Sequence, residues 1–319
     1  MRDEKSYAKW VRGENGHLTK RYHAIDPAEH AVVCTCGRDD CHRARLLPLR
    51  EHIAELYRVI RDIHEEEIAV CDPSRWESVL YGLRMAASID DVEADTGYVE
   101  DPMVFALCEP TIDYEYGQSE MASKYVAAAT IFNFLWQAYE ATVSETASDE
   151  LKRLIKEQRF GERGRRLLES RPELSQRFRG VSDLVKLALT HCRMGELMTE
   201  RCERIEQKYG SSTLVAAAEL AREFRNFLFH GGDESPGHED WVDVAKSRCR
   251  IYRFYSVSVL ILYLIQAMAW IDHESDDERT EYGSEDEALT PREIFERLQF
   301  KGPGIWPPLK GEMPATAAC

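Results

Sequence analysis

The chain has 319 residues and a mass of 36.7 kDa, which suits about two domains. With 44% hydrophobic and 31% charged residues it can bury a core, so disorder throughout is excluded. The formal net charge of −16 excludes a protein that binds duplex DNA over its whole surface. Residues 89–116 and 272–287 carry −9 and −8 of that charge, however. The rest of the chain is therefore close to neutral, and a nucleic-acid site on it is compatible with the composition.

The N-terminal sequence and one apolar segment bear on the cellular compartment. Residues 1–5 lack the apolar stretch of a secretory signal, so we expect the nine cysteines to be reduced thiols of a cytoplasmic protein. Residues 254–271 are 18 residues without a charge, the lower limit for a membrane span. Because this segment contains Ser256, Ser258 and Gln266, it favours a helix buried on all sides within a protein; a single membrane span is the alternative.

The expected elements of the first third are mainly helices. Apolar residues at helical spacing predict a helix over 46–70, and Pro73 opens a second helix that runs to about residue 89. The acidic stretch that follows contains Pro102 and Pro110, which predicts a linker or a solvated loop. The pattern supports a strand only near 31–34.

The remainder of the chain is expected to be helical as well. Long helices are expected over 119–145 and 241–271, with shorter helical segments over 151–168, 181–209 and 291–298. The run Ser211-Ser212-Thr213 offers N-caps for a further helix. Gly231 and Gly232 end that helix, because glycine adopts the left-handed conformation at low cost.

These elements predict an all-α fold with three parts. They are a smaller, mostly helical N-terminal region over 1–110, a helical bundle over 117–272, and a loose acidic tail over 273–319 that contains prolines and glycines.

The most informative motif ends the helix capped at 211–213. Its sequence over 223–232 is Glu-Phe-Arg-Asn-Phe-Leu-Phe-His-Gly-Gly. Asn226 and His230 are one helical turn apart and share a face, while the long side chain of Arg225 can reach over the same cleft. Gly231 places His230 at the helix C-terminus, where the helix dipole favours the protonated imidazole. The apolar neighbours would hold these three polar residues rigidly.

This set of side chains suits metal-independent cleavage of RNA. An imidazole that titrates near neutrality can take a proton from a ribose 2′-OH or deliver one to a leaving 5′-oxygen. A guanidinium can hold the phosphate through two hydrogen bonds and stabilise its developing charge. Arg225, Asn226 and His230 are therefore the candidate catalytic residues. In the alternative interpretation, Arg225 and Asn226 only satisfy neighbouring polar groups and His230 is an ordinary helix-terminal residue.

The pattern Arg225-Asn226-x-x-x-His230-Gly231, late in a helix and followed by another long helix, resembles the R-N-x-x-x-H-G signature of HEPN-domain proteins. The resemblance covers about residues 119–272. It implies a helical bundle, a homodimer whose catalytic Arg and His lie in a cleft shared by two protomers, and in many relatives an RNase of a prokaryotic toxin or anti-phage defence system. It also implies a partner such as an antitoxin or another defence-system protein. Some HEPN relatives bind without cutting.

A basic stretch outside the motif supports RNA as the partner. Residues 151–180 contain ten Lys or Arg against four Glu in a chain that is acidic elsewhere. Clustered arginine follows a phosphate backbone, so Arg163, Arg165 and Arg166 are candidate substrate-binding residues. The alternative is a solvated helical face paired with the acidic residues of the protein itself.

A third cluster has the ligand types of a zinc site. Cys34, Cys36, Cys41 and His42 lie within nine residues. Their spacing lacks the two C-x₂-C pairs of common zinc folds, and free thiols in a turn are the alternative. A zinc ion here would be structural, and the proposed catalysis requires no cofactor.

Together these features predict a dimeric, metal-independent endoribonuclease that cleaves RNA by attack of the 2′-OH. The chain contains no P-loop, dinucleotide-binding, zinc-protease or nucleophile-elbow motif. The alternative function is a non-catalytic, HEPN-like helical interaction protein whose apolar last long helix forms an oligomer interface. A zinc-bearing adaptor built on the N-terminal region is a third hypothesis.

Overall fold

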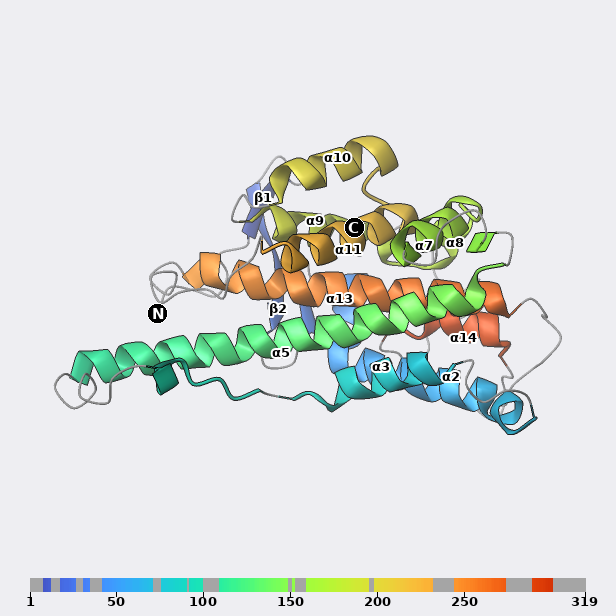
Figure 1. Cartoon of the computed structure of the whole chain (residues 1–319). Helices are drawn as coiled ribbons and strands as arrows, with labels where there is room; N and C mark the ends of the chain where they lie inside the picture. The colour runs from blue at the N-terminus through green and yellow to red at the C-terminus, as the bar shows by residue number, and fades with distance from the viewer. Residues whose placement is uncertain are drawn as a thin grey trace.

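In a computed structural model, the chain folds around two long helices, α5 (Glu109–Thr146) and α13 (Val244–Asp272), which lie side by side (Figure 1). The structure describes residues 8–12, 18–26, 31–34, 42–70, 76–90, 92–99, 109–148, 151–152, 159–194, 198–231, 244–273 and 289–300. The other helices are α1 (His42–Arg45), α2 (Leu49–Val70), α3 (Glu77–Ser88), the 3-10 helix η1 (Thr96–Val99), α7 (Phe160–Glu169), α8 (Leu174–Arg177), α9 (Val181–Arg193), α10 (Thr199–Tyr209), α11 (Leu214–Phe229) and α14 (Pro291–Arg297).

The two long helices separate two groups of shorter helices (Figure 1). On one side α3 packs against α5, and α2 packs against both α3 and α13. On the other side α9 and α11 pack against α13. The motif helix α11 also contacts α7 and α10, and α7 in turn contacts α5.

Helix α13 is surrounded by protein. Every residue from Ile251 to Ile271 is buried. The segment Arg250–Asp272 is long and apolar enough to cross a membrane, but 94% of its most apolar window is buried inside the protein. The predicted helix buried on all sides is therefore confirmed. Since α13 presents no exposed face over this length, it is not available as an oligomer interface, and that part of the alternative function is wrong.

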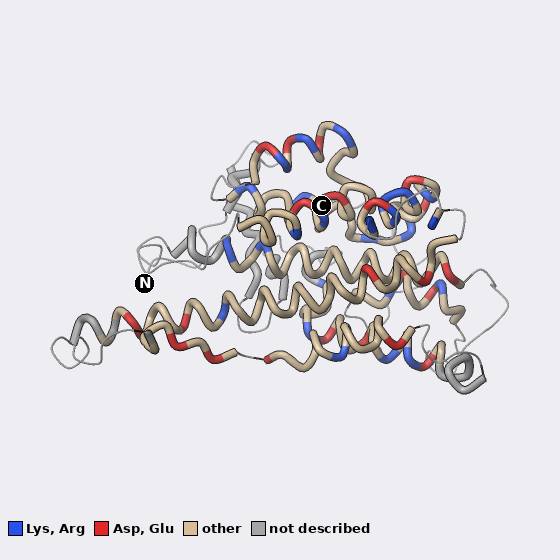
Figure 2. The backbone as a smooth tube through the Cα atoms, viewed as in Figure 1, with Lys and Arg blue, Asp and Glu red and all other residues tan. Residues whose placement is uncertain are grey.

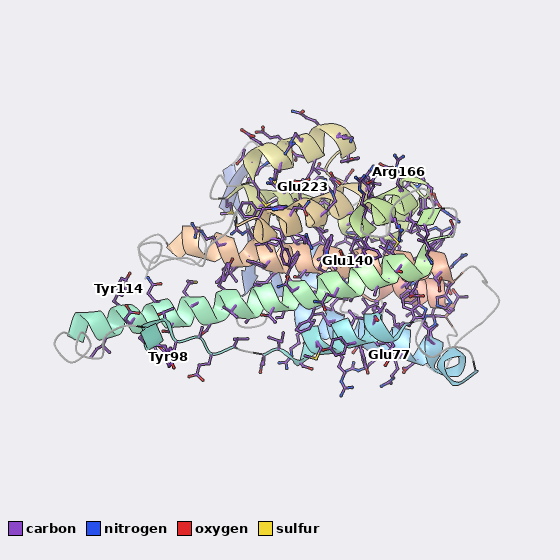
Figure 3. All side chains as sticks on the ribbon, viewed as in Figure 1. Glu77, Tyr98, Tyr114, Glu140, Arg166 and Glu223 are labelled. Carbon is purple, nitrogen blue, oxygen red and sulfur yellow. The ribbon has the colours of Figure 1, made fainter. Side chains whose placement is uncertain are left out.

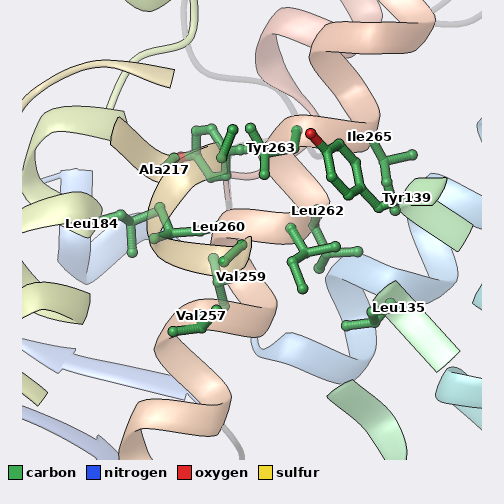
Figure 4. Packing of buried hydrophobic residues seen from close by; sticks show 14 of the residues in the cluster. Leu135, Tyr139, Leu184, Ala217, Val257, Val259, Leu260, Leu262, Tyr263 and Ile265 are labelled. Atoms are coloured by element: carbon green, nitrogen blue, oxygen red, sulfur yellow. The ribbon is translucent and has the colours of Figure 1, made fainter. Parts of the chain in front are cut away.

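One hydrophobic core joins the three predicted parts of the chain, 1–110, 117–272 and 273–319. Leu135 and Tyr139 of α5 pack with Leu262 and Ile265 of α13 (Figure 4). The same core takes in α3 and α14. Among the described residues, the predicted boundaries near 110 and 273 therefore do not separate independent cores.

The predicted all-α fold is confirmed by this helical body. A small element was missed at the N-terminus, where β1 (Ala8–Arg12), β2 (Leu18–Asp26) and β3 (Ala31–Cys34) pair in order as an antiparallel meander. The pattern had indicated only the third strand.

Part of the predicted acidic linker is packed and helical. Helix α5 begins at Glu109 rather than near 119, and residues 92–99 run along it. Ala94 donates its backbone N–H to the Ser123 hydroxyl at 2.9 Å, and Thr96 donates to Ser119 at 3.1 Å. These bonds fix the segment against α5, so the expectation of a solvated loop is wrong here.

The described part of the predicted loose tail is also packed. Helix α14 begins with a capping box, in which the Thr290 hydroxyl accepts a bond from the Glu293 backbone N–H and the Glu293 carboxylate accepts one from the Thr290 backbone. Ile294, Phe295 and Leu298 are buried against the core. The expected helix near 291–298 is confirmed, and it anchors this part of the chain.

Candidate functional site

The motif helix has the ends that its sequence predicts. The hydroxyl of Thr213 accepts a hydrogen bond from the Ala216 backbone N–H at 3.1 Å, which satisfies one free donor of the first turn. The helix ends at Phe229, and Gly231 follows with φ of +69°, a conformation that favours glycine.

The side chain of Arg225 is partly buried and packs against a residue of its own helix. Its guanidinium carbon lies 4.3 Å from the centre of the Phe229 ring. Its Nε is buried, and it has no hydrogen-bond partner among the described residues. Among the same residues no carboxylate lies within 4.0 Å of its guanidinium, so Arg225 has no direct ion-pair partner there, although its charge acts on the Glu140 carboxyl across the groove.

An open groove of about 470 Å³ lies beside Arg225, between α5, α7, α10 and α11. Five cationic and three anionic side chains line it, so its lining has a positive excess. The lining residues are Trp136, Glu140, Arg159, Phe160, Gly161, Glu162, Arg165, Lys208, Tyr209, Glu219, Arg222, Arg225 and Asn226. The structure thus places Arg225 and Asn226 of the motif in one cationic groove.

Three of the five cations in the groove are neutralised by neighbours. Arg159 pairs with Glu162 at 3.4 Å, and Arg222 pairs with Glu219 at 2.7 Å. Arg165 pairs with Glu169. The two cations that pair with no carboxylate among the described residues are Arg225 and Lys208, whose ammonium lies 5.0 Å from the Tyr209 ring centre. An anionic ligand would therefore find its compensating charge at these two positions.

Glu140 is a carboxylate of the groove, and its burial disfavours the negatively charged form. Burial raises the pKa of the Glu140 carboxyl above its ordinary value, while the Trp136 indole and the Arg225 guanidinium act in the opposite direction.

His230 lies at the end of the motif helix, outside the groove lining. It is exposed, and its backbone N–H donates to the Asn226 carbonyl at 3.1 Å. Its neighbour Phe229 is 59% exposed. Within one chain the structure therefore unites Arg225 with Asn226 in the groove and leaves His230 at the adjacent surface.

The three arginines expected to bind substrate do not form one surface. Arg163 is buried, its Nη2 donates to the Lys152 carbonyl at 3.3 Å, and its guanidinium lies 5.6 Å from the Phe160 ring centre, so it is a core residue. Arg165 lines the groove, as expected. Arg166 is exposed on α7, outside the groove lining, 3.9 Å from Glu169 (Figure 3). The prediction of a shared arginine patch is wrong, because α7 turns one arginine inward.

The predicted zinc ligands fall largely outside the described residues, which exclude Cys36 and Cys41. Cys34 ends β3, and His42 begins α1 with its ring 5.5 Å from the Phe300 ring. In the part of the chain that the structure describes, no group of three metal-binding side chains occurs.

Sequence reasoning missed the groove residues that come from other helices. Trp136 and Glu140 belong to α5, and Lys208 and Tyr209 belong to α10. One signal was present, since Arg201, Arg204 and Lys208 recur at helical spacing on α10. Figure 2 shows Lys and Arg together with Asp and Glu on α7 and α10, while the middle of the molecule along α5 and α13 carries little charge.

Comparison with known proteins finds no match to this chain among protein-family models, curated proteins or solved structures. The resemblance to HEPN proteins therefore rests on the motif of α11 alone.

Proposed function

We propose that the protein is a metal-independent endoribonuclease of HEPN type that acts at the groove beside α11. The observation that supports the proposal most directly is the position of Arg225. Its guanidinium is fixed against Phe229, lines an open cationic groove together with Asn226, and pairs with no carboxylate among the described residues. A phosphodiester in the groove would supply a direct ion-pair partner for Arg225.

In this proposal each motif residue has one role. Arg225 clamps the scissile phosphate and stabilises the charge that develops on its oxygens. His230 acts as general acid or base, and Asn226 orients the groups around the phosphate. The ribose 2′-oxygen forms a bond to phosphorus as the bond from phosphorus to the 5′-oxygen breaks. The 2′-OH loses one proton and the leaving 5′-oxygen gains one, so the step is balanced. The products are a 2′,3′-cyclic phosphate and a 5′-hydroxyl.

The exposure of His230 fits a site completed by a second copy. We propose a homodimer in which the ends of two α11 helices meet, so that His230 of each chain approaches the groove. The exposed ring of Phe229 provides apolar area next to His230 for such a contact. This arrangement is the one that the HEPN resemblance implies.

The biological setting follows from the resemblance alone. We propose a cytoplasmic toxin or anti-phage defence protein, controlled by an antitoxin or by another protein of its system. A structural zinc at Cys34, Cys36, Cys41 and His42 stays a proposal of the same kind.

The direct test is RNA cleavage by purified protein in EDTA, with His230→Ala and Arg225→Ala as variants. We expect single-stranded RNA to be cut to products ending in 2′,3′-cyclic phosphate, with the cut lost in both variants. Because Arg84 is exposed on α3, on the other side of α5, Arg84→Ala is the control and keeps activity. Cleavage that persists in His230→Ala would remove His230 from the mechanism.

A non-catalytic RNA-binding bundle is the second candidate. The observation that favours it is that His230 does not line the groove of its own chain. RNA binding that depends on Arg225, without any cleavage and without a dimer in solution, would support this candidate instead.

A further inference from the structure

A second hollow of about 210 Å³ lies between α10 and α11. Its lining residues are Arg201, Arg204, Ile205, Lys208, Tyr209, Glu219, Arg222 and Glu223. Four of them, Lys208, Tyr209, Glu219 and Arg222, also line the groove beside Arg225. The two hollows are therefore neighbours on the two sides of these four side chains, and we call them together the trough along α10.

The cations of α10 form a stripe along this trough. Arg201, Arg204 and Lys208 recur at intervals of three and four residues, so they share one face of the helix. All three line the second hollow. At a rise of about 1.5 Å per residue the stripe is about 10 Å long, which is room for more than one backbone phosphate.

Two cations of the second hollow are not compensated. Arg201 pairs with Glu223 at 3.1 Å, and Arg222 pairs with Glu223 at 2.6 Å. Arg204 and Lys208 are exposed, and neither pairs with a carboxylate of the residues that the structure describes. The excess positive charge thus lies on the side chains that are free to meet a ligand.

Tyr209 adds an aromatic ring where the two hollows join. It lines both of them, with the Lys208 ammonium 5.0 Å and the Arg165 guanidinium 5.8 Å from its ring centre. A concave cationic track with an aromatic side chain is the arrangement that binds single-stranded nucleic acid, because the phosphates meet cations and a base can stack on the ring.

We infer that α10 forms a second phosphate-binding site, through Arg204 and Lys208, which holds single-stranded RNA along a track leading to the groove at Arg225. The inference rests on the proposed function, because it takes RNA as the ligand of that groove. It adds that the substrate is a strand several nucleotides long rather than a nucleotide or a dinucleotide. The α10 site contributes affinity and placement and takes no part in the chemistry.

The test measures binding without cleavage. The probes are a fluorescent single-stranded 2′-O-methyl RNA of about 12 nucleotides, which has no free 2′-OH to attack, and the matching dinucleotide. The variants are Arg204→Gln/Lys208→Gln and the control Arg58→Gln/Arg84→Gln, which removes two exposed charges from α2 and α3 on the other side of α5. Full-length dimer or monomer is used as purified, and binding is followed by anisotropy over a range of salt concentrations.

We expect the α10 variant to bind the longer RNA about tenfold more weakly at low salt, and to reduce the slope of log affinity against log salt by about 1.4. Because Lys208 also lines the groove beside Arg225, we expect its affinity for the dinucleotide to fall by a smaller factor. The binding of both probes by the control stays unchanged. An unaltered slope for the longer RNA, an equal loss in the control, or an equal loss for the dinucleotide would overturn the inference. Cleavage of unmodified RNA tests the proposed function separately, so a protein that binds along α10 but does not cut would refute the nuclease and leave this site standing.

Discussion

Phe229 lies directly under the guanidinium of Arg225, at 4.3 Å from ring centre to guanidinium carbon, although the phenylalanine is 59% exposed. The two residues are one turn apart on α11, so the contact is built into the motif helix. An exposed aromatic ring that contributes little to the core is well placed to fix the direction of a charged side chain. The ring therefore links the motif to the groove.

Replacing this ring tests whether it positions Arg225. We expect Phe229→Leu to lower RNA cleavage about fivefold, since it removes the cation–π contact, with little change in stability. Phe229→Tyr keeps the ring face and should stay within about twofold of the natural protein. Cleavage rates and solution mass are measured together. If both variants lose activity and the dimer dissociates, the loss comes from the proposed dimer contact of Phe229 and not from the position of Arg225.

The planar shape of the Arg225 guanidinium, and not only its charge, is expected to matter for cleavage. Arg225→Lys keeps the charge but loses the planar fork that binds two phosphate oxygens, so we expect cleavage to fall about a hundredfold or more. Thermal unfolding should be unchanged, because a partly exposed cation is exchanged for another. Arg84→Lys on α3 is the matched exchange and leaves the rate unaltered. A lysine variant that retains its full rate would mean that charge alone is sufficient.

How much of this structure the sequence predicts depends on how local each signal is. The limits of α11 are set by Thr213 and Gly231, which act on the adjacent turn, and the sequence predicts both correctly. The start of α5 is not predicted, because Pro110 resembles a helix breaker there. In the structure it is the second residue of the helix, where no backbone N–H bond is required.

The groove could be predicted only in part for a similar reason. Arg225 and Asn226 are adjacent in the chain, so their motif is visible in the sequence. Glu140 and Lys208 reach the same groove from other helices, and only the packing of α5 and α10 around α11 brings them together. The position around the helix also determines where Arg163 and Arg165 point. They are two residues apart, and Arg163 points into the core while Arg165 points into the groove.

The close approach of α3 to α5 gives a prediction about stability. An alanine Cβ at Gly82 would lie 2.8 Å from the Phe134 carbonyl oxygen and 2.9 Å from the Ala138 Cβ. Because the first of these is a backbone atom, the helices must move apart, and Gly82→Ala should cost about 1–3 kcal/mol of unfolding free energy.

Gly117 provides the matched control for that substitution. It also lies inside a helix, and an added Cβ would meet nothing within 4 Å. Gly117→Ala should therefore stabilise the protein by about 0.5–1 kcal/mol through helix propensity. Urea unfolding measures both variants. Equal effects of the two substitutions would contradict the tight contact between α3 and α5.

A buried chain of hydrogen bonds links His52, Gln266 and Gln299. The amide nitrogen of Gln266 donates to the Phe295 carbonyl at 2.7 Å and to the Gln299 side chain at 3.1 Å. Its amide oxygen is therefore the acceptor for the His52 imidazole, whose Nε2 lies 2.8 Å away. The proton of neutral His52 is thus on Nε2, and the buried Nδ1 has no hydrogen-bond partner among the described residues.

Protonation of His52 would place a charge in this core, so burial lowers the pKa of its imidazole from 6.5 to about 4. Between these values the unfolded chain takes up a proton that the folded protein does not. The stability associated with neutral His52 is therefore fully present above about pH 6.5 and falls as the pH drops toward 4, by roughly 3 kcal/mol in all.

His52→Gln removes this titration and can still donate an amide N–H to Gln266. Urea unfolding at a series of pH values should show the natural protein losing more stability than the variant on acidification. Parallel curves for the two proteins would mean that His52 titrates alike in both states, which a sealed imidazole cannot do.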